Sequence, residues 1–307
     1  MTSAQPTVAE RPAIATPDFE GRPLPHPDEP VFDQGLFFDV GTLSRRRVLQ
    51  ALGFGAVSAG MFTILGCQPG GSTQSAGTGA TAGSGATAGS SFAAGTACDV
   101  IPEETAGPYP GDGTNGPDVL TESGIVRQDI RSSIAGASGV AQGVDLSIRL
   151  RIVDAAKDCA PMAGAAVYLW HCTRDGKYSM YSSGVENQNF LRGVQVAASD
   201  GVATFTSVFP GCYSGRWPHI HFEVYPDVAS AADASKVIAT SQIALPEDIC
   251  KQVYGQSGYE ASVANLAGTS LARDNVFGDD SGVHQLGTMS GAIGNGLTVD
   301  LQVPVQA

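Results

Sequence analysis

Two histidines separated by a single residue are the clearest chemical signal in this sequence. His219 and His221 lie in the stretch FPGCYSGRWPHIHFEVY, residues 209–225. In a β-strand, side chains two residues apart project from the same face, so both imidazoles point into one space. Ile220 and Phe222 fall on the opposite face, as in a strand buried on that side. Because imidazole is a common metal ligand, the pair predicts half of a metal's coordination shell.

Further residues with chemical potential stand near this strand or at the ends of other predicted elements. Tyr213 and Arg216 precede the histidines and follow a Pro-Gly turn signal. Tyr178 ends a polar turn after a predicted strand over 165–170, and Tyr109 lies close to where the folded part begins. Taken singly, Tyr178 and Tyr213 are more typical of structural turn positions, and Arg216 is compatible with a surface ion pair worth about 0–1 kcal/mol.

The elements that must position these groups are predicted to be β-strands. Residues 145–154 alternate apolar and polar side chains, which is typical of a half-buried strand. Strands are predicted over residues 145–154, 165–170, 202–208, 218–225, 236–244 and 297–303. Turns rich in Gly, Pro, Asp and Ser separate them, which predicts an all-β fold, an antiparallel β-sandwich. The looser pattern over 246–275 predicts a short helix and loop that cover one end of the sandwich.

Composition divides the 307-residue chain into four parts. Residues 1–44 are proline-rich and acidic without periodicity, which predicts disorder. Residues 45–67 begin with arginines and continue as an uncharged apolar run. Residues 68–97 are almost wholly Gly, Ser, Thr, Ala and Gln, which predicts a flexible linker. Residues 98–307 form the predicted folded domain.

The arginine-led segment 45–67 resembles a twin-arginine export signal. Its end, Leu65-Gly66-Cys67, resembles a lipobox, in which the cysteine is lipidated. We therefore predict an exported protein on the periplasmic or extracellular side. A lipid anchor at Cys67 and an uncleaved signal are alternative membrane attachments, since the apolar run of about 19 residues is near the lower limit for a span. A buried core helix would leave the arginines and the linker unexplained.

Charge and cysteine content restrict the partners and the compartment. The net charge of −13 comes without a basic stripe, which excludes nucleic acid as a predicted partner. In an oxidising compartment, the five cysteines after Cys67 allow two disulfides and one free thiol, with the pairing open. These cysteines are Cys98, Cys159, Cys172, Cys212 and Cys250.

Several motifs together resemble those of the intradiol ring-cleavage dioxygenases, the family that contains protocatechuate 3,4-dioxygenase and catechol 1,2-dioxygenase. The matching pieces occur in the family's order. They are WHCxxxGxY at 170–178, FLRGVQ at 190–195, DGVATF at 200–205, PGCYSGRWPHIH at 210–221 and, more weakly, DNVFGD at 274–279.

The resemblance implies a non-haem Fe(III) centre. It assigns the ferric ion to two tyrosinates, Tyr178 and Tyr213, and two histidines, His219 and His221. Phenolate and imidazole suit a hard ferric cation, whereas structural zinc prefers thiolate and imidazole in a closed tetrahedron.

The resemblance also implies a reaction. An aromatic diol and O2 are the substrates, the ring opens between the two hydroxyl-bearing carbons, and a cis,cis-muconate forms. Tyr213, released from the metal when the diol binds, would act as the base. Arg216 would stabilise negative charge on the substrate, and Tyr109 matches a position that lines the substrate pocket.

Departures from the family pattern keep alternatives open. Only Ser214-Gly215 separates the second tyrosine from Arg216, which is shorter than in the classical enzymes and resembles a secreted branch. Pro110 stands where an aromatic residue commonly follows Tyr109. The main alternative is a noncatalytic exported β-sandwich that binds iron or a catechol ligand. A zinc hydrolase is disfavoured, because no third histidine or carboxylate stands at an informative spacing. The catechol and the oligomeric state stay open.

Overall fold

The computed structural model describes residues 98–307 and two short pieces, 18–19 and 22–23. In these pieces β1 (Asp18–Phe19) pairs antiparallel with β2 (Arg22–Pro23). The predicted export signal, the predicted lipidation site at Cys67, the predicted linker and the rest of the predicted disordered segment lie outside the described residues. Within the described part, no helix is both long enough and apolar enough to cross a membrane.

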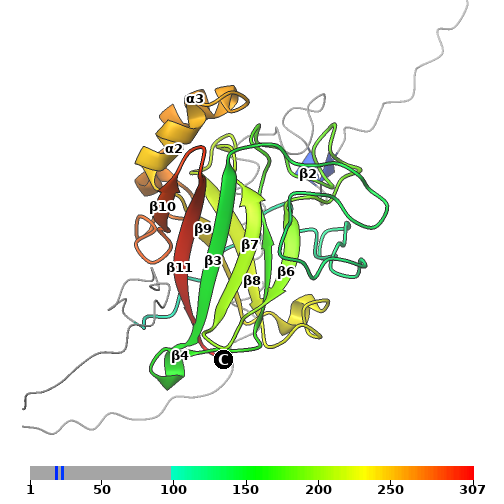
Figure 1. Ribbon diagram of the computed structural model, residues 1–307, viewed down its shortest axis with the longest axis vertical. Coiled ribbons are helices and arrows are strands. Elements are labelled where there is room, and N and C mark those ends of the chain that lie inside the picture. The colour runs from blue at the N-terminus through cyan, green and yellow to red at the C-terminus, as the bar shows by residue number, and fades with distance from the viewer. Residues whose placement is uncertain (1–17, 20–21, 24–97) are drawn as a thin grey trace, which may run out of the picture.

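Two β-sheets stack to form the predicted sandwich (Figure 1). The first sheet contains β10 (Thr288–Ala292), β11 (Gly296–Val305), β3 (Asp145–Asp154), β4 (Ala160–Pro161) and β7 (Val202–Val208), with β4 and β7 both paired to β3. The second sheet has the order β6 (Arg192–Val196), β5 (Ala166–Trp170), β8 (His219–Tyr225) and β9 (Ala239–Ala244). The all-β sandwich is therefore confirmed.

One strand pair departs from the antiparallel expectation. β11 runs parallel to β3, with Leu297 opposite Leu146 and Val305 opposite Asp154. Parallel neighbours need a long connection, and here most of the domain lies between the two strands in sequence. The strands β4, β6 and β10 were not predicted, since β4 is very short and β6 and β10 contain glycine and lack a clear apolar alternation.

The core between the sheets is built from alternating strand residues. β3 contributes four aliphatic side chains to this core, of which none is more than 1% exposed. They are Leu146, Ile148, Leu150 and Ile152. From the other sheet, Ile220, Phe222 and Val224 of β8 belong to the same cluster. Full burial of such a side chain contributes about 1.5–3 kcal/mol, so these two strands form the stable base of the domain.

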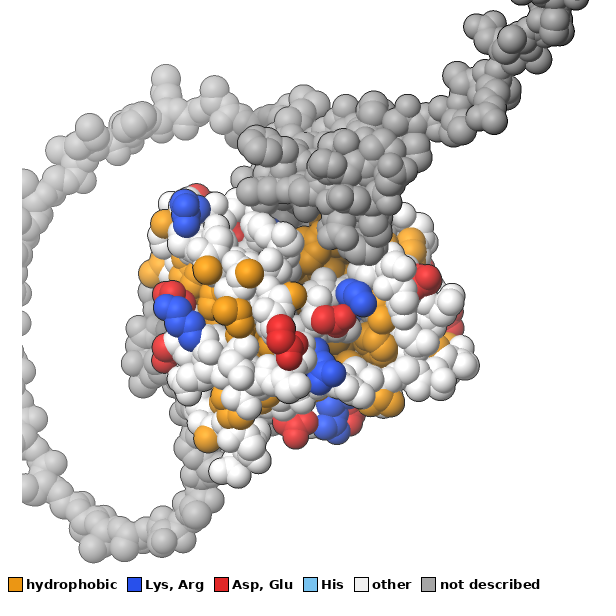
Figure 2. Space-filling model, turned by 90° about the horizontal axis from the view of Figure 1, so that it is seen from above, with side chains coloured by type: hydrophobic (Ala, Val, Ile, Leu, Met, Phe, Trp, Pro, Cys, Tyr) orange, Lys and Arg blue, Asp and Glu red, His pale blue; other side chains and the backbone are white. Residues whose placement is uncertain are grey.

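Helices cover the end of the sandwich at which β9 finishes. Two helices, α2 (Glu247–Tyr254) and α3 (Glu260–Ala267), stand where one short helix was predicted, and a 3-10 turn, η4 (Leu271–Arg273), follows. α2 buries Cys250, Val253 and Tyr254, which share one helical face. Figure 1 shows both helices at one end of the sandwich. Figure 2, which views the molecule from above, shows acidic and basic side chains interspersed with apolar ones on the described surface.

Two further 3-10 turns, η2 (Ala155–Lys157) and η3 (Ala234–Lys236), complete the elements. η3 explains why β9 begins at Ala239 rather than at the predicted residue 236. The backbone at 234–236 curls into a turn capped by the side chain of Asp233, which accepts a hydrogen bond from Ser235 N.

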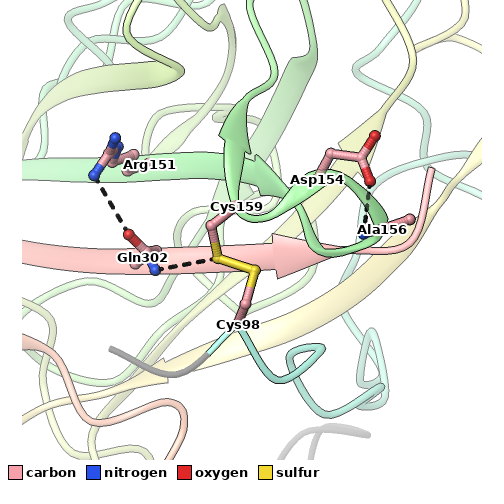
Figure 3. Close-up of a disulfide and its surroundings, with 6 residues drawn as sticks. All are labelled: Cys98, Arg151, Asp154, Ala156, Cys159 and Gln302. Atoms are coloured by element: carbon pink, nitrogen blue, oxygen red, sulfur yellow. Dashed lines mark hydrogen bonds between the residues drawn. A yellow bond between two sulfur atoms is a disulfide. The ribbon is translucent and has the colours of Figure 1, made fainter. Parts of the chain in front are cut away.

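The segment that begins at Cys98, called here the N-terminal arm (residues 98–110), runs along the edge of β9. Glu104 N donates to Thr240 O at 2.7 Å, and Thr240 N donates to Glu103 Oε1 at 3.0 Å. Pairing of this kind satisfies the free edge of the strand. A disulfide between Cys98 and Cys159 fastens the start of the arm beside β3 and β11 (Figure 3).

The other cysteines of the domain are not paired. Cys172, Cys212 and Cys250 are free and buried. The domain therefore contains one disulfide and three thiols, where composition allowed two disulfides and one thiol.

The disulfide should carry much of the arm's stability. It closes a loop with a sequence separation of 61 residues, and in the chain-entropy model such a loop is worth about 4 kcal/mol. We expect the double variant Cys98→Ser/Cys159→Ser to lose about 2–5 kcal/mol of unfolding free energy, measured by urea denaturation. Reductant should shift the wild-type midpoint and leave the variant unchanged. Equal midpoints for wild type and variant without reductant would contradict this assignment.

Candidate metal centre

The predicted histidine pair lies on β8, an inner strand of the second sheet. Ile220 and Phe222 point into the core between the sheets, so His219 and His221 project from the other face, as the alternation predicts. That face is also covered, and each histidine is only 3% exposed. Trp170, the cross-strand neighbour of His221, stacks on its imidazole with ring centroids 4.9 Å apart and an angle of 5° between the planes. Packing thus fixes this ring.

Tyr178 reaches the same space from a tight turn after β5. Thr173 closes the turn twice, because its N donates to Lys177 O at 2.7 Å and its Oγ1 accepts from Lys177 N at 2.9 Å. Tyr178 Oη then lies 3.3 Å from His219 Nε2 and 3.4 Å from His221 Nε2. The two Nε2 atoms are 3.0 Å apart. Three donor atoms from two separate segments therefore form a compact triangle.

The spacing of this triangle fits a shared metal ion. With sides of 3.0, 3.3 and 3.4 Å, a point about 1.9 Å from all three atoms exists, close to the ~2.0–2.2 Å of typical metal bonds to nitrogen and oxygen. His219 Nδ1 lies 2.6 Å from Trp217 O, a partner that holds the proton on Nδ1 and leaves Nε2 free to bind. Within the described residues, no group of three or more His, Cys, Asp and Glu side chains could hold a metal. A metal here would therefore depend on the phenols.

Burial determines the protonation of the three donors. It lowers the pKa of His219 to about 3, with the charge of Arg216 adding to the effect. It also lowers the pKa of His221 well below its ordinary value, with His219 and Arg216 contributing. Both imidazoles are thus neutral at neutral pH, the form that binds metals. Burial, followed by the nearby Cys172, raises the pKa of Tyr178 well above its ordinary value. Only a strong local cation would ionise this phenol.

The short spacer Ser214-Gly215 joins Tyr213 to Arg216. Arg216 N donates to Tyr213 O at 3.1 Å, so the four residues form a β-turn. Gly215 has φ of 80°, which only glycine adopts at low cost, and Ser214 occupies the other central position. Two residues are therefore enough to place both side chains beside one cavity.

Helix α3 holds the segment before Tyr213. Ser262 Oγ accepts from Cys212 N at 2.9 Å, and Asn265 Nδ2 donates to Cys212 O at 2.8 Å. Tyr213 is 8% exposed, and its hydroxyl lies 3.4 Å from that of Tyr109. Its contact with Tyr109 thus places Tyr213 in the same site.

Arg216 is not a surface charge. Its Nε donates to Asp274 Oδ2 at 3.0 Å and its Nη2 to Asp274 Oδ1 at 3.2 Å, and the two side chains are 9% and 0% exposed. Nη2 also donates to Gln242 Oε1 at 2.9 Å. Burial opposes ionisation of Asp274, but the charge and hydrogen bonds of Arg216, with backbone N–H donors from Trp217 and Val276, lower its pKa. The ion pair is therefore formed and buried.

The N-terminal arm forms the opposite wall of the site. Gly107 has φ of 71°, and a Cβ there would lie 3.2 Å from His221 Cε1, so the arm passes directly over the imidazole. Arg192, only 1% exposed, fixes the next residues by donating to Tyr109 O at 2.9 Å and to Pro110 O at 2.7 Å. It also donates to Ser179 O at 3.0 Å, next to Tyr178. One guanidinium thus ties the arm to the tyrosine turn.

A cavity collects these groups. Its lining comprises Thr105, Gly107, Pro108, Tyr109, Tyr178, Tyr213, Arg216, His219, His221 and Asn275. Its free volume is about 20 Å³, room for about one water molecule. An aromatic ring can therefore enter only when a lining side chain moves aside.

All six residues singled out from the sequence line this one cavity. Tyr178, His219 and His221 are in mutual contact, whereas Tyr213, Arg216 and Tyr109 complete the walls. His171, the histidine of the WHCxxxGxY motif, does not line this cavity. Its Nε2 lies 2.7 Å from Ser207 Oγ and its Nδ1 2.8 Å from Cys172 O.

Sequence reasoning missed the two residues that position Arg216, Asp274 and Gln242, and the cavity residue Asn275. Asp274 and Asn275 lie in the weak DNVFGD match, which was the one available signal, and no role was attached to it. Gln242 sits in a strand whose sequence, ATSQIA, gives no chemical hint. Arg192 belongs to the FLRGVQ motif, and its contacts with Tyr109 O and Ser179 O place it just outside the proposed ligands.

Comparisons with known proteins find similarity to dioxygenases. A family model described as dioxygenase matches residues 115–223. A chlorocatechol 1,2-dioxygenase of Rhodococcus opacus is 32% identical over 100 residues, which cover 26% of this chain and 39% of that relative. The chain thus spans well under half of the curated relative that it matches.

Two solved structures share the fold over the whole domain. An intradiol ring-cleavage dioxygenase from Tetranychus urticae aligns with a TM-score of 0.54 and 25% identity, covering 68% of this chain and 95% of that one. A second dioxygenase crystal structure aligns with a TM-score of 0.52 and 26% identity, with the same coverage of 68% and 95%. The chain thus matches the dioxygenase family model over residues 115–223 and is similar in fold to an intradiol ring-cleavage dioxygenase.

Proposed function

We propose that the domain is a non-haem Fe(III) dioxygenase that cleaves a catechol-type ring between its two hydroxyl-bearing carbons. The observation that carries this proposal is the triangle of Tyr178 Oη, His219 Nε2 and His221 Nε2, whose sides of 3.0–3.4 Å suit donors to one metal. Tyr213 is the fourth proposed ligand; it lines the same cavity, and its ring centroid lies 5.8 Å from that of Tyr178. The family similarity supports the same reaction class.

The donor set favours ferric iron over zinc. Two phenols and two neutral imidazoles provide hard donors, and two ionised phenolates would compensate much of a 3+ charge. A weaker Lewis acid would be less able to ionise Tyr178, because burial raises its pKa so far. When bound, the ferric ion would supply the activation of the diol toward O2.

The side chains of the protein have separate tasks in the proposed reaction. Tyr213, whose hydroxyl lies 3.4 Å from that of Tyr109, is the proposed base that takes a hydroxyl proton of the entering diol. Movement of Tyr213 would also open the small cavity. Arg216 is held by Asp274 and Gln242 through Nε and Nη2, and its Nη1 has N–H groups that these bonds do not use. It is the proposed donor to negative charge developing on the substrate.

The proposed overall reaction needs no co-reactant other than O2. One carbon–carbon bond breaks, both oxygen atoms enter the product, and catechol plus O2 becomes cis,cis-muconic acid. The close burial of the site by the N-terminal arm would keep bulk water from the reacting ring. Export through the segment 45–67 remains part of the proposal and would place the substrate outside the cytoplasm.

A visible colour and oxygen consumption together test the proposed function. Ferric tyrosinate should give the purified protein a charge-transfer band, and we expect O2 uptake with at least one of catechol, protocatechuate and hydroxyquinol. Metal analysis should find iron near one equivalent per chain. A coloured, iron-loaded protein without O2 uptake would favour the noncatalytic binder, and a colourless zinc protein would exclude the ferric site.

The ligand assignment predicts loss of iron from single variants. Tyr178→Phe and His221→Ala each remove one corner of the donor triangle, so iron content and the visible band should fall together in both. Tyr259→Phe is the matched control, because this buried tyrosine donates to Phe209 O outside the cavity. Full iron content and activity in Tyr178→Phe or His221→Ala would refute the site.

Arg216 is expected to affect turnover more than metal retention. Arg216→Ala should keep the colour and lower kcat by about 10²-fold, the usual effect of removing one charge-stabilising donor. It also leaves Asp274 buried and unpaired, which should cost about 3–5 kcal/mol of unfolding free energy. The double variant Arg216→Ala/Asp274→Asn removes both charges and should recover part of the stability but no turnover. Unchanged kcat in a folded, coloured Arg216→Ala protein would contradict the role.

A further inference from the structure

The side-chain amide of Asn275 is a polar group of the cavity wall that has neither a role in the proposed chemistry nor a hydrogen-bond partner among the described residues. Asn275 lines the cavity together with the proposed ligands. Both Nδ2 and Oδ1 are buried, and neither has a hydrogen-bond partner among the described residues. A buried amide without partners costs about 1–3 kcal/mol, so natural structures normally satisfy it. A ligand in the cavity is the natural partner.

The backbone around Asn275 is held firmly by its neighbour. The carboxylate of Asp274 accepts from Trp217 N at 2.6 Å on one side and from Val276 N at 2.9 Å on the other. It also accepts from Phe277 N at 3.2 Å and pairs with Arg216. The same residue that positions the arginine thus fixes the chain on both sides of the amide. A group held in this way is preorganised for binding.

The chemistry of the amide indicates what it would bind. A carboxamide offers an acceptor oxygen and a donor NH2, and a hydroxyl group can both donate and accept. A carboxylate substituent fits less well, because it only accepts and would need a cation. Arg216 is the one charged side chain in the described lining, and Asp274 already neutralises it. The cavity therefore matches a neutral hydroxyl better than an acid.

We propose that Asn275 is a specificity-determining residue that binds a further ring hydroxyl, so that trihydroxybenzenes are the preferred substrate class. The two vicinal hydroxyls common to all catechols face the proposed ligand set, and the third meets the amide. This inference rests on the proposed dioxygenase function, and it adds the substituent that the site selects.

Substrate selectivity in the full-length, iron-loaded protein tests the inference. The probes are hydroxyquinol and pyrogallol, compared with catechol and protocatechuate by O2 uptake. We expect kcat/KM for at least one trihydroxybenzene to exceed that for catechol and for protocatechuate by about tenfold or more, because a site built for a hydroxyl discriminates against substrates that lack it. Faster turnover of catechol or protocatechuate would overturn the inference and leave the dioxygenase function intact. No uptake with any probe would overturn both.

Variants of Asn275 assign the selectivity to the amide. Asn275→Leu keeps the size and removes both polar atoms, and Asn275→Ala tests the same loss in a smaller side chain. In each, the ratio of kcat/KM for the trihydroxybenzene to that for catechol should fall about 3- to 10-fold, the range for one lost hydrogen bond. Asn187→Leu, at an exposed position, is the matched control and should keep the wild-type ratio.

A binding measurement separates this role from a structural one. Under anaerobic conditions, shifts of the visible band report the Kd of each diol without turnover. The ratio of the two Kd values should change in the Asn275 variants by a similar factor. Unchanged Kd and kcat/KM ratios in a coloured Asn275 variant would overturn the assignment. Should neither variant fold, the wild-type selectivity decides alone.

Discussion

The register between β5 and β8 is the constraint on which the rest of the site depends. It sets Trp170 opposite His221, and the indole lies flat against the imidazole with centroids 4.9 Å apart. A shift by one residue would turn both histidines into the hydrophobic core, because neighbouring side chains alternate between faces. Ile220 and Phe222 oppose such a shift, since each is completely buried between the sheets. The core thus maintains the metal-facing side of the strand as well as its own.

Because the three donor atoms are buried, Tyr178 can ionise only with a cation beside it. His219 and His221 are neutral, Tyr178 is a protonated phenol, and each is nearly inaccessible to solvent. Donor atoms this close repel one another when the phenol ionises unless a positive charge lies among them. The charge of Arg216, the one charged side chain in the described lining, is compensated by Asp274. The arrangement is therefore electrically balanced before any ligand arrives, and negative charge brought by the tyrosinates or substrate must be matched by the metal.

The sandwich and the cavity residues could both be predicted from the sequence, but each from a different kind of signal. Strands such as 145–154 were visible because each turns alternate residues into the core, so the pattern repeats along the strand. Residues of the site were visible through motifs and a family resemblance, not through periodicity. The parallel pairing of β3 and β11 was not visible, because strand periodicity is the same for parallel and antiparallel neighbours. Asp274 and Gln242 were missed because their importance comes from contacts with Arg216 across 58 and 26 residues of sequence. Asn275 was missed because only its place in the cavity wall gives it a role.

The short Ser214-Gly215 spacer explains the placement of Tyr213 and Arg216, but it says less about the substrate than its departure from the classical pattern indicated. A β-turn fixes the separation of Tyr213 and Arg216 by itself, and α3 fixes the turn through Ser262. A longer loop is therefore not needed to place the arginine. The walls that the turn does not build come from the N-terminal arm and from the segment at Asn275. The arm is fastened by Arg192 and by the disulfide at its start, while the segment at Asn275 is fastened by Asp274. Differences in substrate between this domain and its relatives should therefore be sought in these two walls, because the ligand strand and its turn serve the metal.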